Sequence, residues 1–325
     1  ALPRTTAHAM FRDEDLALLT EVAAVTEAAG QRHSEPFARN LSRARVAITG
    51  WGSPRFDAEV LAMAPRLEMV AHSAGSVRGI VSESLFDRGI RVTSSAAANA
   101  APVAEFTVAA MVMLLKQVPW IAQAHKEGDR TAKDRYRPLL RELRDMDVGL
   151  VGASRVGREV IRLLGSYPRL RIKVFDPHLP AKQARQLGVE QATLEEVCRC
   201  EVVSIHAPAL PSTRHMFNAR TLALLPDHAV LINTSRGSLI DEAALYAEAS
   251  KRPIYVLLDV TDPEPMRPDS PLRTLPNVIL TPHIAGAMNQ ARRDMGRLAI
   301  EEAMRFLRGE PLRHEVTREM LEVVA

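Results

Sequence analysis

The chain has 325 residues, of which 46% are hydrophobic and 25% charged, and it carries a formal net charge of +3. This size and composition are typical of a globular protein with two domains. The basic residues are scattered among acids and form no block and no stripe with interleaved aromatic residues, so we expect no nucleic-acid partner.

The cysteines and the apolar segments bear on three further questions: metal binding, secretion and membrane insertion. Cys198 and Cys200 are the only cysteines and have no further metal ligands nearby in sequence, so we expect no metal site and two free thiols in a reducing cytoplasm. The first residues lack the basic segment and apolar core of a secretory signal. The longest apolar stretch, residues 103–115, contains Glu105 and is too short to span a bilayer, so we expect a cytoplasmic protein with no membrane partner.

In chain order, the first part of the sequence alternates short strands with helices. Residues 46–49, 67–71 and 90–93 are runs typical of strands, and a helix is expected from 57 to 62. This βα alternation predicts a parallel sheet. Residues 94–102, which are rich in Ser, Ala and Asn, have the composition of a linker or hinge.

The rest of the chain predicts a second βα lobe and a return to the first. An apolar helix over 103–125 should be buried on more than one face, and a βαβ series runs from 148 to about 281. The last helix, over 289–307, should pack on the first lobe. We therefore predict an α/β protein with an outer lobe (1–98 and 288–325), an inner lobe (99–287) and a ligand cleft between them.

A glycine-containing turn marks the start of the second lobe. Gly152 and Gly157 follow a predicted strand with the spacing of a dinucleotide-binding turn: the first permits the tight turn, and the second lets the next helix pack closely. The helix start, at Arg155 and Val156, offers free N–H groups to a pyrophosphate. Ser154 stands where a further glycine is expected. Its Cβ could hold the pyrophosphate further away, or its hydroxyl could donate to a phosphate oxygen.

An acid at the end of the next strand indicates which dinucleotide is bound. Asp176 lies 19 residues after Gly157, where a carboxylate can accept hydrogen bonds from the adenosine ribose diol. The same charge would repel a 2′-phosphate, so the sequence favours NAD over NADP.

Three reactive side chains come directly after short apolar runs. Arg236, Glu264 and His283 each lie just past a predicted strand, at the edge where parallel sheets bind ligands. Arg236 can bind a carboxylate through its fork, His283 can exchange a proton with a carbonyl oxygen, and Glu264 can orient the imidazole. Together with the dinucleotide turn, these residues indicate hydride transfer to or from a carboxylate-bearing substrate.

Nearly the whole chain resembles the NAD-dependent D-2-hydroxyacid dehydrogenases. The matching blocks are residues 203–208, 213–215, 231–237, 258–260 before Glu264-Pro265, and 281–286. The resemblance implies a flavodoxin-like substrate-binding outer lobe and a doubly wound NAD-binding inner lobe, with catalytic residues Arg236, Glu264 and His283. Asp259 would help to hold the nicotinamide end, whereas His206 is either structural or close to the adenine. The implied cofactor-binding residues are Gly152, Ser154, Arg155, Val156, Gly157, Asp176, His206, Ala207, Pro208, Thr213, Thr234, Asp259 and His283.

A loop of the outer lobe is the second substrate candidate. Similar loops in the family hold the substrate carboxylate with backbone N–H groups, which implies that Gly75 and Ser76 bind substrate together with Arg236 and His283. Arg78, where many relatives have an acid, either selects a second anionic group or points to solvent, and we favour solvent. Trp51 either lines the mouth of the cleft or has a packing role.

The sequence leaves two functions open. The leading one is a dehydrogenase or reductase of a small D-2-hydroxy acid or 2-oxo acid, with phosphoglycerate, glyoxylate and hydroxypyruvate chemistry as alternatives. Formate dehydrogenases of the superfamily carry an amide partner for the histidine, whereas this chain has Glu264. The other function is a dinucleotide-sensing binding protein, similar to corepressors of this fold. Relatives pair through the cofactor lobe, so we expect a homodimer, although the apolar helix could instead be buried within one chain.

Overall fold

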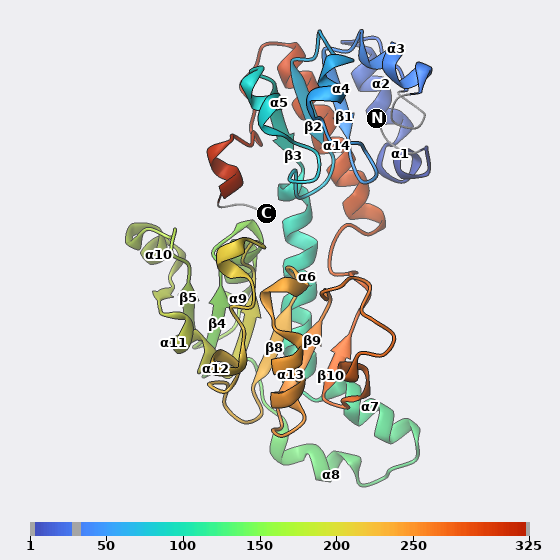
Figure 1. The fold of residues 1–325 in the computed structure, drawn as a ribbon. Helices are drawn as coiled ribbons and strands as arrows, with labels where there is room; N and C mark the ends of the chain where they lie inside the picture. The colour runs from blue at the N-terminus through green and yellow to red at the C-terminus, as the bar shows by residue number, and fades with distance from the viewer. Residues whose placement is uncertain (1–3, 28–33, 323–325) are drawn as a thin grey trace. The chain divides into compact units, whose positions relative to one another are not determined.

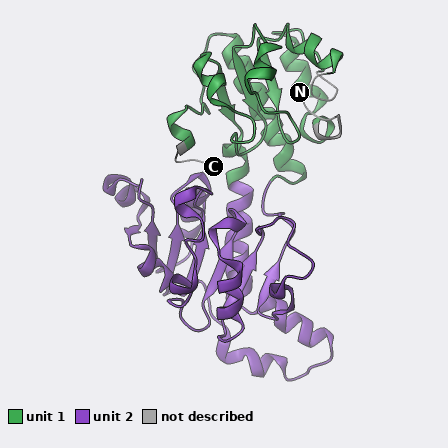
Figure 2. Cartoon of the chain, in the orientation of Figure 1, with its two compact units in different colours: residues 1–100, 287–325 green, residues 101–286 purple. Residues whose placement is uncertain are grey.

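A computed structural model describes residues 4–27 and 34–322, which form two compact units (Figure 2). Unit 1 contains residues 1–100 and 287–325, and unit 2 contains residues 101–286. Residues 1–3, on which the expectation about a secretory signal partly rests, lie outside the described residues. Each unit has one parallel sheet with helices on both faces (Figure 1), which confirms the α/β prediction.

Unit 1 is built on a three-stranded parallel sheet whose strands follow chain order. The strands are β1 (Val46–Thr49), β2 (Met69–His72) and β3 (Arg91–Ser94). One face is covered by α3 (Glu35–Leu41), α4 (Ala58–Ala62) and α5 (Glu83–Asp87). The other face is covered by α2 (Asp13–Thr20) and α14 (Asn289–Leu307), and α1 (Arg4–Met10) packs on α14. The prediction that the last helix returns to the first lobe is therefore confirmed.

Unit 2 holds a seven-stranded parallel sheet in the order β10-β9-β8-β7-β4-β5-β6. The strands are β4 (Asp147–Val151), β5 (Arg171–Phe175), β6 (Glu190–Gln191), β7 (Val202–Ile205), β8 (Val230–Asn233), β9 (Tyr255–Leu258) and β10 (Val278–Leu280). Chain order reverses between β4 and β7, so this doubly wound sheet has its switch point there. Ligands of such sheets bind outside the carboxyl ends of the strands at that point.

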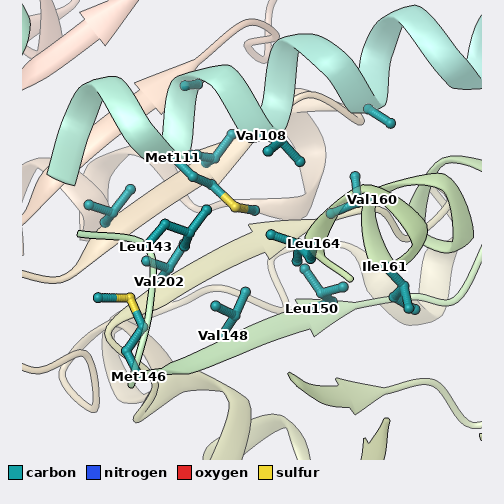
Figure 3. Close-up of a cluster of buried hydrophobic side chains, with 14 of the residues drawn as sticks. Val108, Met111, Leu143, Met146, Val148, Leu150, Val160, Ile161, Leu164 and Val202 are labelled. Atoms are coloured by element: carbon teal, nitrogen blue, oxygen red, sulfur yellow. The ribbon is translucent and has the colours of Figure 1, made fainter. Parts of the chain in front are cut away.

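Helices bury both faces of this sheet. One face is covered by α6 (Ala96–Leu115), α9 (Arg155–Leu164) and α10 (Ala181–Leu187), and Figure 3 shows side chains of α6 and α9 packed against β4 and β7. The other face is covered by α11 (Leu194–Cys198), α12 (Ala219–Leu222) and α13 (Glu242–Ala249). Because β7, β8 and β9 are buried on both faces, they appear in the sequence as continuous apolar runs.

Shorter helices complete the described chain. They are α7 (Val118–Lys126), α8 (Ala132–Tyr136) and five short 3-10 segments: Arg137–Leu139, Pro211–Thr213, Gly237–Leu239, Pro271–Thr274 and Glu319–Glu322.

Two predictions around α6 need correction. Residues 94–102, expected to be a linker or hinge, are helical from Ala96 onward, and the Ser94 hydroxyl accepts the Ala96 N–H at 3.1 Å. The boundary between the two units does fall in this segment, between residues 100 and 101. Ala has the highest helix propensity, and in this segment it outweighs Ser and Asn. The predicted helix over 103–125 is two helices, because Gln117 adopts a left-handed φ of 53° between α6 and α7.

The sequence analysis excluded a membrane span here because the apolar stretch looked too short. Helix α6 has 20 residues and is long and apolar enough to cross a membrane, so its length does not exclude a span. Half of it is buried inside the protein, however, and Val108, Met111 and Leu114 belong to the core of unit 2 (Figure 3). A core helix of a globular protein has this character.

Candidate active site

The turn between β4 and α9 is shaped by two glycines. Gly152 has a φ of 97°, and a Cβ there would lie 2.8 Å from the His206 carbonyl oxygen. A Cβ on Gly157 would overlap the carbonyl oxygen of Gly152. Neither position therefore tolerates a side chain, as expected where a turn and a helix must approach closely.

The helix start beyond this turn fits a pyrophosphate. Ser154 is the N-cap of α9, and its hydroxyl accepts the Gly157 N–H at 3.3 Å. The hydroxyl thus caps the helix, and its proton remains available to a phosphate. The N–H groups of Arg155 and Val156 point out of the first helical turn, where an anion is favoured by both hydrogen bonding and the helix dipole.

Asp176 is fixed beside the same turn. One carboxylate oxygen accepts the Ala153 N–H and the other accepts the His178 N–H, each at 2.8 Å. Asp176 directly follows β5 and is only partly buried. The glycine turn, the helix start and this carboxylate are the parts that a dinucleotide with a free ribose diol requires.

The loop after β7 is closed by its own hydrogen bonds. Thr213 Oγ1 donates to the Pro208 carbonyl at 2.7 Å and accepts the Leu210 N–H at 2.9 Å. His206 is buried, and its ring nitrogens have no partner among the described residues. Burial lowers the pKa of His206 to about 3, so the ring is neutral. Of the cofactor candidates here, Ala207 is buried, and Thr234 is also buried with its hydroxyl 3.2 Å from that of Thr107 on α6.

The three reactive residues follow three neighbouring strands. Arg236 comes after β8, Glu264 after β9 and His283 after β10, and these strands lie side by side (Figure 1). His283 Nδ1 and Glu264 Oε1 are 2.5 Å apart. Burial lowers the pKa of Arg236, and the negative charge of Glu264 opposes that shift. An acid, an imidazole and a cation therefore meet at the carboxyl edge of one sheet.

Asp259 ties down the loop that carries His283. It is 1% exposed, and its carboxylate accepts the N–H groups of Ile284 and Ala285 at 2.8 and 2.9 Å and the Thr281 hydroxyl at 2.6 Å. The Asp259 carbonyl oxygen also accepts the His283 N–H at 2.9 Å. These bonds hold His283 at a left-handed φ of 57°.

The sequence analysis missed two residues at this edge. A Cβ on Gly237 would overlap the carbonyl group of Thr261, so the Arg236 loop touches the Glu264 loop through their backbones. Glu242 accepts the Asp262 N–H at 2.9 Å. The signal for Glu242 was its place directly after Asp241, which already caps α13 and leaves the neighbouring acid free for another role.

In unit 1, the predicted substrate loop turns its carbonyl groups inward. The Ser94 hydroxyl donates to the Gly75 carbonyl at 2.5 Å, and the Ser95 N–H donates to the Ala74 carbonyl at 3.0 Å. Since the C=O and N–H of one trans peptide point in opposite directions, the N–H groups of Gly75 and Ser76 turn the other way.

Two side chains of unit 1 lie at its surface. Arg78 is exposed, but its guanidinium donates to the Leu321 carbonyl and so does not simply point to solvent. Trp51 is 41% exposed, with the Arg292 guanidinium 5.6 Å from its ring centre. The indole is thus a surface stacking partner for a cation and does not belong to a core.

The described residues contain no group of three or more His, Cys, Asp or Glu side chains suited to a metal ion. Cys198 and Cys200 are buried and free, and burial raises the pKa of each thiol to about 12. Such thiols are protonated at neutral pH, so they are poor nucleophiles.

Comparison with known proteins identifies one family. Residues 108–285 match the family described as D-isomer specific 2-hydroxyacid dehydrogenase, NAD binding domain. The chain is 30% identical to D-3-phosphoglycerate dehydrogenase of Methanocaldococcus jannaschii over 303 residues, which cover 92% of this chain and 56% of that protein. It is 31% identical to glyoxylate reductase of Aeropyrum pernix over 296 residues, which cover 89% of this chain and 88% of the relative. The chain thus spans about half the length of the first relative and most of the second.

A solved structure agrees with these sequence matches. The crystal structure of a phosphoglycerate oxidoreductase from Rhizobium etli is 29% identical, has a TM-score of 0.82 and covers 98% of both chains. The likeness therefore extends over both units.

Proposed function

Because this chain belongs to the D-isomer-specific 2-hydroxyacid dehydrogenases and residues 108–285 form their NAD-binding domain, we propose that it transfers a hydride between NAD(H) and a small D-2-hydroxy acid or 2-oxo acid. The observation that carries this proposal is the His283–Glu264 pair next to the Arg236 loop, on the sheet that also carries the dinucleotide turn.

Each reactive side chain has one proposed role. Bound NAD supplies the hydride chemistry. Arg236 binds the substrate carboxylate through its fork and polarises the adjacent carbonyl. In the reductive direction, His283 gives a proton to the carbonyl oxygen, and in the oxidative direction it takes that proton back. Glu264 accepts the Nδ1 proton at 2.5 Å, which leaves Nε2 as the nitrogen that faces the substrate oxygen.

The remaining site residues divide between the two units. We propose that residues 99–287 bind NAD through the turn at Gly152–Gly157, Asp176, the loop after β7, Thr234 and Asp259. Residues 1–98 and 288–325 would bind substrate, with Gly75 and Ser76 N–H groups directed at its carboxylate. The inward bonds of Ser94 and Ser95 support this orientation.

We also propose a cytoplasmic homodimer that pairs through the NAD-binding domain. Met113 on α6 and Val118 at the start of α7 are 46% and 40% exposed, so a partner subunit that covers this surface would remove apolar area from water. The buried free thiols fit a reducing compartment. Light scattering at micromolar concentration should show a dimer, and a monomer would refute the pairing.

The test of the proposed reaction is the decay of nicotinamide absorbance. Wild-type protein is mixed with NADH, and in parallel with NADPH, against glyoxylate, hydroxypyruvate, pyruvate and phosphohydroxypyruvate. We expect NADH-dependent reduction of at least one acid and weaker use of NADPH, because Asp176 repels a 2′-phosphate. Tight NADH binding with no turnover on this panel would contradict the proposal and favour a dinucleotide-sensing protein.

A further inference from the structure

The loop from Asp259 to Met266 carries Glu264, and side chains and backbone from other segments hold it in place. Arg214 reaches the Asp262 carboxylate at 3.2 Å, and the Thr261 hydroxyl donates to the Pro263 carbonyl at 2.8 Å. The Arg214–Asp262 ion pair is exposed, and exposed ion pairs contribute little rigidity. Two further attachments act on backbone groups of the loop: the close contact of Gly237 and the hydrogen bond to Glu242, which is also exposed.

The backbone contact at Gly237 sets how close the two loops lie. A Cβ there would overlap the Thr261 carbonyl group and the Asp262 nitrogen, so the segment after Arg236 and the segment before Glu264 are packed backbone to backbone. This packing contact brings the two loops together, but it does not determine how the Asp262 peptide is oriented. A hydrogen bond is needed to set the orientation of the Asp262 peptide.

Glu242 supplies that hydrogen bond from the start of α13. Its Oε1 accepts the Asp262 N–H at 2.9 Å. The bond is not part of the helix cap, because Asp241 Oδ1 already accepts the N–H groups of Ala243 and Ala244, each at 3.1 Å. Glu242 therefore reaches out of its own helix and fixes the peptide two residues before Glu264.

Burial disfavours the charged form of Glu242 and thereby raises its pKa. The Asp262 N–H lowers that pKa, whereas the like charge of the Asp262 carboxylate adds to the shift. The hydrogen bond to the Asp262 peptide is therefore the interaction that favours the ionised carboxylate.

We propose that Glu242 is a positioning residue: its carboxylate fixes the Asp262 peptide and thereby the direction from which Glu264 approaches His283. This inference rests on the proposed function for its catalytic consequence, but the loop attachment itself does not depend on activity. The carboxylate does not touch the substrate, and it acts only through Asp262 and Glu264.

Two substitutions separate positioning from charge. Glu242→Gln keeps a carbonyl oxygen that can accept the Asp262 N–H and removes the charge that burial disfavours. Glu242→Ala removes the acceptor. Glu196→Ala is the matched control, because the Glu196 carboxylate also accepts a backbone N–H, that of Thr193 at 2.7 Å, in the cap of α11 in the same unit.

The first readout is kinetic and thermal. We expect Glu242→Ala to lower kcat by about tenfold or more, because misplacing a catalytic group by a fraction of an ångström costs that much. Glu242→Gln should stay within about threefold of wild type and melt at the same or a higher temperature. The Glu196→Ala control should lower the melting temperature and leave kcat unchanged. A Glu242→Ala enzyme with wild-type kcat, or a Glu242→Gln enzyme as slow as Glu242→Ala, would overturn the proposal.

The second readout is amide hydrogen exchange of the loop, which needs no turnover. Peptides that cover residues 259–266 should exchange faster in Glu242→Ala and at the wild-type rate in Glu242→Gln. Unchanged exchange in Glu242→Ala would overturn the attachment even if the enzyme is active. If Glu242→Ala exchanges faster but the wild-type protein reduces no 2-oxo acid, the attachment of the loop is supported and the proposed function is refuted.

Discussion

The loop that carries Glu264 in unit 2 and the loop at residues 74–77 in unit 1 both follow a strand of a parallel sheet, but they are held by different chemistry. Two acids hold the edge in unit 2: Glu242 binds the Glu264 loop and Asp259 binds the His283 loop. Neutral groups hold the loop in unit 1, namely the Ser94 hydroxyl and the Ser95 N–H. The acids orient groups that would exchange a proton, whereas the neutral groups orient N–H donors that would only bind. We therefore expect damage to the first loop to lower kcat and damage to the second to raise KM.

The largest effect in this comparison should come from Gly237→Ala. The new methyl group would overlap the Thr261 carbonyl and push the Arg236 and Glu264 loops apart. We expect kcat/KM to fall by about 100-fold, the loss that a misplacement of about 1 Å produces, measured by steady-state kinetics with NADH and the preferred 2-oxo acid. Gly79→Ala is the control, because its Cβ would meet nothing within 4 Å. Similar activity in the two variants would show that the close approach of the loops is unimportant.

A smaller effect is expected from Ser94→Ala. Loss of the hydroxyl releases the Gly75 carbonyl and lets the Ser76 N–H turn away from the substrate, so KM should rise by roughly fivefold to tenfold, the effect of losing about 1 kcal/mol of binding, while kcat changes little. Ser82→Ala is the matched control, because the Ser82 hydroxyl donates to the Phe56 carbonyl at 2.6 Å in the same unit. A lower kcat with unchanged KM in Ser94→Ala would contradict the claim that the loop in unit 1 only binds substrate.

Acid sensitivity should be the smallest effect near neutral pH. Burial lowers the pKa of His72, which follows Ala71 in unit 1, from 6.5 to about 4, and that of His206 in unit 2 to about 3. Both rings bind a proton in the unfolded chain below pH 6.5 but stay neutral in the folded protein. The free energy of unfolding should therefore fall as pH drops from 6.5 towards 4, by up to about 1.4 kcal/mol per pH unit for each histidine. Glu242 acts in the opposite direction, since burial raises its pKa.

The measurement is urea unfolding at pH 7, 6 and 5. The slope of the unfolding free energy against pH should be smaller in His72→Gln than in the wild type, because one fewer histidine binds a proton on unfolding. An equal slope in the variant and the wild type would mean that His72 is not a buried neutral ring.

Much of the fold and site follows from local patterns in the sequence. The strands β8, β9 and β10 are short, largely apolar runs, and the turn at Gly152 has a fixed glycine spacing. Arg236, Glu264 and His283 come shortly after those three runs. The position of helix α14 follows from the sequence because its apolar residues recur at helical spacing.

The parts that the sequence did not reveal are those without a local signal. Helix α6 starts at Ala96, seven residues before the predicted position of 103. The Ser and Asn residues of 94–99 indicate a loop, whereas the alanines of 96–101 favour a helix. Glu242 and Ser94 act on backbone groups about 20 residues away in sequence, at Asp262 and Gly75. Neither a periodicity nor a motif marks such side-chain to backbone bonds, since they depend on how two loops meet.

The measurement that tests the central claim most directly is the turnover of His283→Ala beside His125→Ala, an exposed histidine on α7. Both variants are assayed with NADH and the best 2-oxo acid, and NADH binding is titrated by fluorescence. We predict that His283→Ala binds NADH but loses turnover by about two orders of magnitude or more, as a lost general acid should, while His125→Ala matches wild type. Near-normal turnover of His283→Ala would contradict the assignment of the His283–Glu264 pair as the proton donor.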